Sequence, residues 1–272
     1  FMTATPRVFA GKVTRLAKED EQEIASMDDE SIFGPELHHM SFAQAIKRDL
    51  LADYRLLVVG IDDAEYRRYA EFGKLVVLDG EEVVTNAREV ASQIGLAKAI
   101  HKYDLRRVIT FHGRIKRASQ FSKVLPQIVE WMPEDERPTG RLWSQAVSGK
   151  MSTGERRRYL NQLKRLEDAE RGILSNARCL GEGIDVPTLD GIAFVDPRQS
   201  QVDIVQAVGR AIRKGPEPKI STIVIPVFIE PGADGEEVLN KSAYQAIAGV
   251  LRALRAHDEF LGEELDAARR EL

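Results

Sequence analysis

From residue 108 onward, short apolar stretches alternate with longer stretches whose apolar residues recur at helical spacing. The predicted strands cover residues 108–111, 142–147, 172–176, 192–195 and 220–229, and the predicted helices cover residues 114–131, 153–167 and 200–213. Strands that alternate with helices pair in parallel through right-handed crossovers, which place helices on both faces of the sheet. The pattern therefore predicts an α/β fold with a doubly wound, mostly parallel sheet flanked by helices.

The stretches on either side of this alternation set the expected domain boundaries. A short apolar strand at 56–60 and a helix at 87–103 extend the α/β unit toward the N-terminus, and the sequence after residue 236 is helical and polar. Apolar residues of this last stretch share one helix side, which either forms a partner surface or packs back on the domain: Ile247, Val250, Leu251 and Leu254. We predict a linker segment at 1–52, the α/β domain at 53–232 and a C-terminal helical extension at 233–272.

Composition is ordinary for a soluble globular protein, with 43% hydrophobic and 30% charged residues. The formal net charge of −4 excludes a generally basic surface, so any nucleic-acid binding requires a local patch. The single cysteine, Cys179, cannot form an intramolecular disulfide, which fits a reducing compartment, and we expect the cytoplasm. No apolar run approaches the ~20 residues of a membrane span, so we expect no membrane partner. His38 and His39 have no further ligands at a useful spacing, so we expect no bound metal.

The predicted helix at 200–213 is the most informative stretch. At ~100° per residue, its apolar residues fall on one side, and these are Ile204, Val205, Val208 and Ile212. The opposite side carries Gln206, Gly209, Arg210 and Arg213. Two arginines one turn apart are suited to bidentate contact with phosphate oxygens, although a solvated arginine face is the alternative. Gly209 costs ~1 kcal/mol relative to alanine in a helix interior, which a close approach by a backbone or nucleotide would justify.

A glycine-bearing loop follows the predicted strand at 172–176. It holds Gly181, Gly183 and Asp185 before Pro187. A dinucleotide-binding turn would need a third glycine and a continuing helix where Pro187 stands, so that reading is excluded. Such a loop exposes backbone N–H groups that can hold phosphate, and a tight turn between strands is the alternative.

Two clusters of cations open predicted helices. Arg114, Lys116 and Arg117 follow the strand at 108–111, where helix N–H groups and positive charge suit a nucleic-acid phosphate. A polar first turn explains them equally well. Arg156–Arg158 open the helix at 153–167, whose far end carries acidic residues, the reverse of what the helix dipole favours. Either a solvated face or phosphate contact accounts for this second cluster.

Taken in order, these stretches resemble the conserved motifs of the superfamily 2 helicases, the broad group that contains the DEAD- and DEAH-box proteins. Residues 206–213 resemble motif VI, 176–187 motif V and 108–119 motif IV, and Met2–Pro6 resembles motif III at the end of the first lobe. Each motif is weak alone, but the ordered set is specific and spans nearly the whole chain.

The resemblance implies a RecA-like lobe that closes over ATP held by another lobe. Arg210 and Arg213 would be arginine fingers, Gln206 and Gly209 would lie at the nucleotide, and Gly183 and Asp185 would couple nucleotide to nucleic acid. The implied nucleic-acid contacts are Phe111, His112, Gly113, Arg114, Lys116, Asn176 and Gly181. We expect the nucleic acid to be DNA rather than RNA.

The sequence lacks the motifs that hold ATP and Mg²⁺. No stretch fits Gly-x-x-x-x-Gly-Lys-Ser/Thr, and no apolar strand ends in an Asp-Glu-x-His or Asp-Glu-x-Asp motif. We therefore expect the second lobe of an ATP-dependent helicase, a nucleoside-triphosphate hydrolase that is inactive without its N-terminal lobe. Two alternatives stay open: a double-strand translocase that does not unwind, and a non-catalytic, nucleotide-responsive interaction module.

Overall fold

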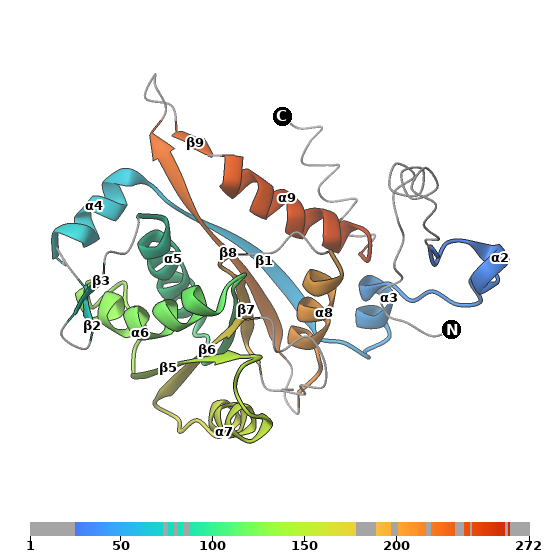
Figure 1. Ribbon diagram of the computed structural model, residues 1–272, viewed down its shortest axis with the longest axis horizontal. Helices are drawn as coiled ribbons and strands as arrows, with labels where there is room; N and C mark the ends of the chain where they lie inside the picture. The colour runs from blue at the N-terminus through green and yellow to red at the C-terminus, as the bar shows by residue number, and fades with distance from the viewer. Residues whose placement is uncertain are drawn as a thin grey trace.

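The protein forms a twisted, mainly parallel sheet between two layers of helices (Figure 1). The computed structural model describes residues 25–72, 76–78, 81–83, 87–177, 189–196, 201–215, 219–231, 237–239, 241–258 and 261. The parallel strands are β1 (Asp53–Ile61), β4 (Arg107–Phe111), β5 (Arg141–Ser148), β6 (Glu170–Ala177), β7 (Gly191–Phe194) and β8 (Ile220–Pro231). They lie in the order β1-β8-β7-β4-β6-β5, and β9 (Glu237–Leu239) adds to β8 in the antiparallel direction. The predicted α/β fold is confirmed.

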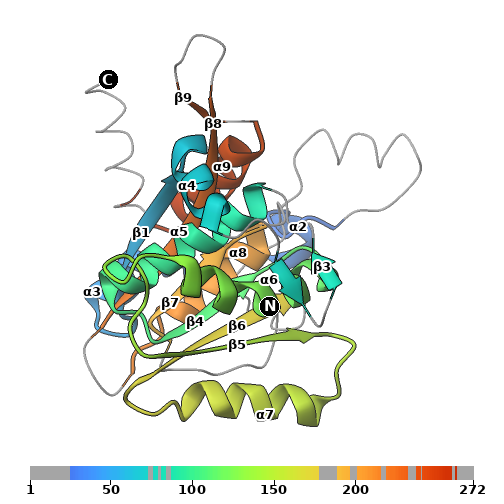
Figure 2. The ribbon, with the colours of Figure 1, turned by 90° about the vertical axis from the view of Figure 1, so that its left-hand side faces the viewer.

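Helices cover both faces of this sheet (Figure 2). One face packs against α4 (Asp63–Phe72), α5 (Ala87–Tyr103) and α6 (Ile115–Trp131). The other packs against α7 (Thr153–Lys164), α8 (Gln201–Ala211) and α9 (Lys241–Arg255). Neighbouring residues of one strand serve the two cores, because successive strand side chains point to opposite faces. Val108 lies in the α5–α6 core and Ile109 in the α8–α9 core.

The element bounds differ from the predicted ones in a few places. Residues 237–239, predicted to be helical, form strand β9, because pairing with the end of β8 overrides their local preference. The helix expected over 153–167 ends at Lys164, and the helix expected over 200–213 ends at Ala211. Sequence reasoning also missed α4 and four short elements, which are α2 (Glu30–Phe33), α3 (Phe42–Lys47), β2 (Val76–Leu78) and β3 (Glu81–Val83). The short ones hold too few residues to show a periodicity.

Helix α9 packs back on the lobe, which resolves one of the alternatives left open by the sequence. Val250 and Leu254 are fully buried against α8 and the sheet. The segment before β1 is attached to the same side of the molecule. The backbone N–H of Phe42 donates to the carbonyl of His257, 2.8 Å away, and that of Ala52 donates to Ile212, 2.7 Å away. The domain boundaries at 52 and 232 stay predictions.

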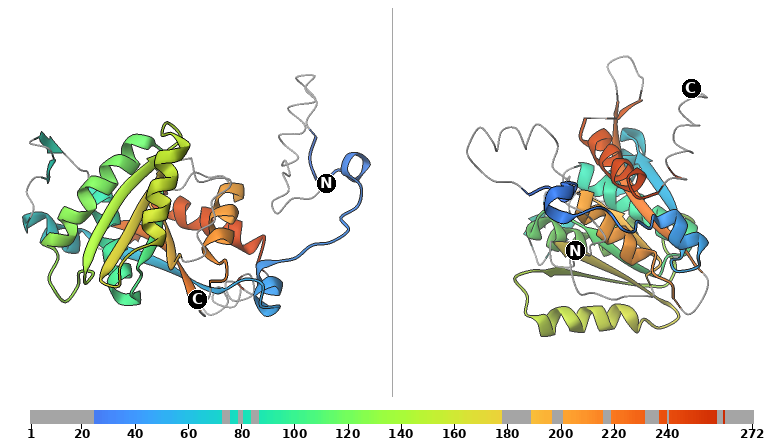
Figure 3. Two further views of the ribbon diagram at one scale, coloured as in Figure 1. Left: turned by 90° about the horizontal axis from the view of Figure 1, so that it is seen from below. Right: turned by 90° about the vertical axis from the view of Figure 1, so that its right-hand side faces the viewer.

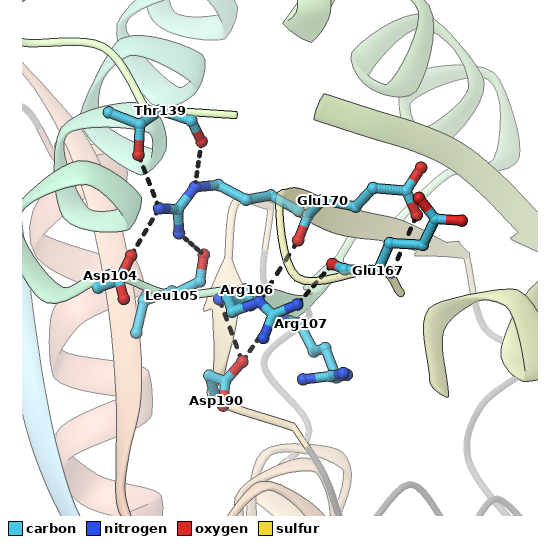
Figure 4. A network of polar contacts seen from close by, with 9 residues as sticks. Asp104, Leu105, Arg106, Arg107, Thr139, Glu167, Glu170 and Asp190 are labelled. Atoms are coloured by element: carbon cyan, nitrogen blue, oxygen red, sulfur yellow. Dashed lines mark hydrogen bonds and ion pairs between the residues drawn. The ribbon is translucent and has the colours of Figure 1, made fainter. Parts of the chain in front are cut away.

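A polar network ties together the amino ends of β4, β6 and β7 (Figure 4). The buried Arg171 guanidinium donates to the carbonyls of Thr139 (2.6 Å) and Leu105 (2.9 Å) and to the Asp104 carboxylate (2.5 Å). Asp190 accepts the backbone N–H of Arg107 at 2.7 Å. These bonds give all three guanidinium nitrogens of Arg171 a hydrogen-bond partner, at the amino edge of the sheet.

Among the described residues, no helix combines the length and the apolar character needed to cross a membrane.

Candidate functional site

The carboxyl ends of β4, β6 and β7 lie side by side at one edge of the sheet, the edge where open α/β sheets bind ligands. The backbone N–H of His112, just after β4, donates to the carbonyl of Asn176 near the end of β6 at 2.9 Å. The N–H of Asp196, after β7, donates to the carbonyl of Phe111 at 3.2 Å. The structure therefore brings together the stretches that resemble motif IV and the start of motif V.

His112 is an internal residue of this edge. Its side chain is 5% exposed, its Nε2 lies 2.8 Å from the Thr110 hydroxyl, and its ring lies 4.8 Å from that of Phe121. Thr110 is in turn hydrogen-bonded to Ser175 of β6, with 3.1 Å between the hydroxyl oxygens. Burial lowers the pKa of His112 to about 4, opposed by Asp196 and reinforced by Arg117. The ring is therefore neutral near pH 7, and its contacts with Thr110 and Phe121 hold the loop after β4. Its contact with nucleic acid stays a prediction.

The backbone of Gly113 lies close to the side chain of Asp196. A Cβ atom at Gly113 would lie 3.1 Å from Oδ2 of Asp196, tighter than nine in ten real Cβ contacts, so the carboxylate would have to shift. The same carboxylate oxygen lies 2.8 Å from Nη1 of Arg117 in the first turn of α6. The need for space next to Asp196 thus explains the glycine. Arg117 is held by this carboxylate, whereas Arg114 and Lys116 are exposed.

The start of α6 is open to solvent and carries positive charge. Arg114 is the N-cap and makes no side-chain capping bond, and the first turn holds no acidic residue. Arg114 and Lys116 are exposed, as is Ile115 between them. First-turn N–H groups without a side-chain cap, together with two exposed cations, form a suitable environment for an anion. Phe111 is half-buried with its ring 5.5 Å from that of Phe194, so much of it serves the packing below this loop.

Helix α8 buries its apolar side as expected. Ile204, Val205 and Val208 are buried, whereas Gln206, Gly209 and Arg210 are partly exposed on the other side. Arg213 is exposed and lies beyond the end of the helix, where it forms an isolated bridge with Leu51. The expectation that both arginines belong to one regular helix is therefore wrong. The last turn tightens, since the N–H of Arg213 donates to the carbonyl of Arg210 at 3.3 Å.

Gly209 is not required by packing among the described residues. A Cβ atom at this position would lie 3.8 Å from the ring of Phe42 in α3, an ordinary van der Waals distance. Alanine would therefore fit, and glycine in a helix costs ~1 kcal/mol relative to it. Packing among the described residues therefore does not explain the glycine, and the close approach of a ligand at Gly209 stays a prediction.

Other predicted site residues lie outside the described structure. These are Gly181, Gly183 and Asp185 of the glycine-bearing loop, together with the stretch Met2–Pro6. Asn176 is described and is buried. Sequence reasoning missed Thr110, Ser175 and Asp196. The position of Asp196, an acidic residue just after a predicted strand, was the available signal.

Comparison with known proteins identifies relatives of this lobe. Residues 91–215 match the family model of the helicase conserved C-terminal domain. A stretch of 57 residues is 38% identical to the "Probable helicase A859L" of African swine fever virus (isolate Pig/Kenya/KEN-50/1950), covering 21% of this chain and 7% of the viral protein.

Two solved structures share the fold over most of the chain. An ATP-dependent Type ISP restriction-modification enzyme, LlaBIII, bound to DNA, is 30% identical with a TM-score of 0.75, covering 88% of this chain and 16% of that one. A fragment of a putative HsdR subunit of a type I restriction enzyme from Vibrio vulnificus YJ016 is 17% identical with a TM-score of 0.51, covering 80% of this chain and 44% of that one. The chain thus spans a small part of the full-length proteins that it matches.

Proposed function

We propose that this chain is the second ATPase lobe of an ATP-driven motor that acts on nucleic acid, because residues 91–215 match the helicase conserved C-terminal domain and the fold is that of a RecA-like lobe. In this proposal another lobe holds ATP, and the present lobe closes over the nucleotide. The arginines near the end of α8 supply positive charge to the phosphates, and the carboxyl edge of the sheet contacts the nucleic acid.

The observation that carries the proposal is the arrangement of α8. The helix is anchored by a fully apolar side, and its other side presents Gln206, Gly209 and Arg210 with Arg213 just beyond. A glycine that internal packing does not need, next to two arginines, fits a surface that a phosphate group approaches closely. Phosphoryl transfer is accelerated mainly by positioned positive charge, which this arrangement can provide.

The residues present fit the phosphates of ATP better than they fit its Mg²⁺. Guanidinium groups bind phosphate oxygens in bidentate fashion. Among the described residues no group of three or more His, Cys, Asp or Glu side chains could hold a metal ion. We therefore assign to this chain the phosphate-facing cations Arg210 and Arg213, and Mg²⁺ would be held by the other lobe.

For the nucleic acid we propose DNA, supported by the restriction-modification enzyme that was solved bound to DNA. The exposed cations Arg114 and Lys116 at the open start of α6 are the proposed phosphate contacts. Whether the motor separates strands or moves along duplex is answered by a strand-displacement assay run beside an ATPase assay.

The test is ATP turnover by the protein that includes the ATP-holding lobe, with Arg210→Ala and Arg213→Ala. Because the arginines reach the phosphates only when the lobes close, kcat should fall far more than nucleotide affinity. Arginine fingers contribute ~10³–10⁵ in kcat in related systems, so a partial effect would still be evident. Arg→Lys should not rescue turnover, because lysine loses the planar fork.

The exposed Arg252 of α9 provides a matched control. Arg252→Ala should leave turnover unchanged. Normal kcat in both Arg210→Ala and Arg213→Ala would reject the motor and favour a non-catalytic interaction module.

A further inference from the structure

Helix α7 carries a concentrated positive charge in a chain whose net charge is −4. Its cations, with the one at its C-cap, are Arg156, Arg157, Arg158, Lys164 and Arg165, and Lys150 lies shortly before the helix. The single acidic residue of the helix, Glu155, accepts bonds from the Ser152 backbone N–H (3.0 Å) and hydroxyl (2.9 Å) in a capping box. The acid therefore serves the helix start.

In the described part of the chain, no carboxylate pairs with the cations of α7. The side-chain bonds of Arg156 and Arg158 go to Thr153 (3.3 Å) and the Tyr159 hydroxyl (3.4 Å). The acidic residues that the sequence placed at the far end of this helix lie beyond it. Of these, Asp168 is 3.8 Å from Arg106 and Glu170 is 3.6 Å from Arg141. The described residues thus place no carboxylate at ion-pair distance from these cations. Only Glu155 senses one of them, since its pKa is lowered chiefly by the hydrogen bonds from Ser152 and in smaller part by the charge of Arg158.

These cations line the outer side of the helix. The inner side packs Tyr159, Leu160 and Leu163 against the sheet, so that Arg157, Arg158, Lys164 and Arg165 are exposed. The row from Arg157 to Arg165 spans about 12 Å at 1.5 Å per residue. Figures 2 and 3 show α7 as the outermost helix on this side of the sheet, with its length open to solvent.

The row begins at the same edge of the sheet as the candidate site, on the opposite face from α6. Helix α7 starts just after β5, whose last residue, Ser148, pairs with Ala177 at the end of β6. Since β6 lies between β4 and β5, the start of α7 and the start of α6 occupy the same carboxyl edge. From there α7 runs back along the sheet, away from the loops at that edge.

Folding explains only part of this charge pattern. Lys164 in the last turn suits the negative end of the helix dipole, and the Arg158 guanidinium lies 5.1 Å from the centre of the Tyr159 ring. Three consecutive arginines in the first half of a helix face the positive end of its dipole, which is unfavourable. Exposed cations such as Arg157 and Arg165 contribute little to stability, whereas a row of guanidinium and ammonium groups matches the spaced phosphates of a nucleic acid.

We propose that the outer face of α7, defined by Arg157, Arg158, Lys164 and Arg165, binds the phosphate backbone of a nucleic acid, as a second contact beside that at Arg114 and Lys116. The inference deepens the proposed function and rests on it. The backbone crosses the carboxyl edge at the start of α6 and follows α7 along the flank of the lobe. The recognition is electrostatic and independent of base sequence.

The test compares Arg157→Ala/Lys164→Ala/Arg165→Ala with a control that removes the same charge from exposed positions elsewhere, Lys47→Ala/Lys102→Ala/Arg252→Ala. Fluorescence anisotropy follows binding of labelled duplex and single-stranded oligonucleotides between 50 and 200 mM salt. The logarithm of the binding constant falls linearly with the logarithm of the salt concentration. Losing three phosphate contacts reduces the magnitude of this slope by about 2.7 on duplex and about 2.1 on single strands. For duplex, the affinity deficit of the variant at 50 mM salt should therefore exceed that at 200 mM by about 40-fold. The control should keep the wild-type slope.

Two further variants make the outcomes distinct. Arg157→Lys/Arg165→Lys keeps the charge and should keep the slope. If the triple variant melts early, Arg157→Ala alone remains informative, because it should reduce the magnitude of the duplex slope by about 0.9. If Arg114→Ala/Lys116→Ala weakens binding while the α7 variants match the control, the inference is overturned and the proposed function stands. If only the α7 variants weaken binding, the inference stands and the proposed contact at α6 fails. No binding by wild type at 50 mM salt would overturn both.

Discussion

Lowering the pH from 7 to 5 should reduce the stability of this lobe, and part of this loss should come from His112. Burial lowers the pKa of its ring to about 4, against 6.5 for an ordinary histidine. Between these two values the unfolded chain binds a proton that the folded protein does not. Stability therefore rises with pH through this window, and it is lost as the pH falls from 6.5 toward 4.

The size of the effect follows from the two pKa values. A difference of one unit corresponds to ~1.4 kcal/mol, so the complete shift amounts to about 3 kcal/mol. With pKa values of 6.5 and about 4, about 2 kcal/mol of this is lost between pH 7 and pH 5. A domain of this kind has a free energy of unfolding of ~5–15 kcal/mol, so the loss should be readily measured.

The assay is urea unfolding of wild type and His112→Gln at pH 7, 6 and 5. Glutamine can still hydrogen-bond to the Thr110 hydroxyl but does not titrate, so other groups cancel in the comparison. The stability advantage of wild type should shrink by about 2 kcal/mol over this range. His101→Gln, which replaces an exposed histidine near the end of α5, is the control. An advantage that stays constant with pH would refute the reasoning.

Two further predictions concern the isolated chain. It should not hydrolyse ATP at a useful rate, because its sequence lacks the phosphate-binding loop and the Mg²⁺-binding acid; steady-state turnover that Arg210→Ala abolishes would contradict this. Ser152→Ala should cost ~1 kcal/mol by removing the capping box of α7, seen as a lower Tm, whereas Asn161→Ala on the exposed side of the same helix should change Tm much less. Equal melting of the two variants would show that the cap contributes nothing.

The overall fold could be predicted because its signals are local and repeated. Strands such as 108–111 are mostly apolar, since a parallel sheet covered on both faces buries both sides of each strand. Helix α8 shows its buried side directly in the spacing of Ile204, Val205 and Val208. β9 could not be found this way, because it is three residues long and exists through its pairing with β8.

The candidate site could be predicted only as far as its position. A polar or charged residue just after a strand must lie at the carboxyl edge, which places the 111–117 stretch and Asn176 together without knowledge of the structure. The orientation of His112 was not accessible, because it depends on Thr110, Ser175 and Phe121 closing around the ring. A histidine in a motif that resembles a nucleic-acid contact therefore serves, in this conformation, to hold the loop.

Arg117 and Arg157 show where sequence reasoning reaches its limit. Each follows a predicted strand, lies in the first half of a helix and belongs to a run of cations, so the two are equivalent by local pattern. In the fold, Arg117 meets Asp196, which arrives from the end of β7, with 2.8 Å between Nη1 and Oδ2. Arg157 forms no ion pair with a described carboxylate, and two of the acids after α7, Asp168 and Glu170, lie beside Arg106 and Arg141. Whether a cation is available to a phosphate is thus decided by which residues lie across the fold, and this distinction places the second proposed contact on α7.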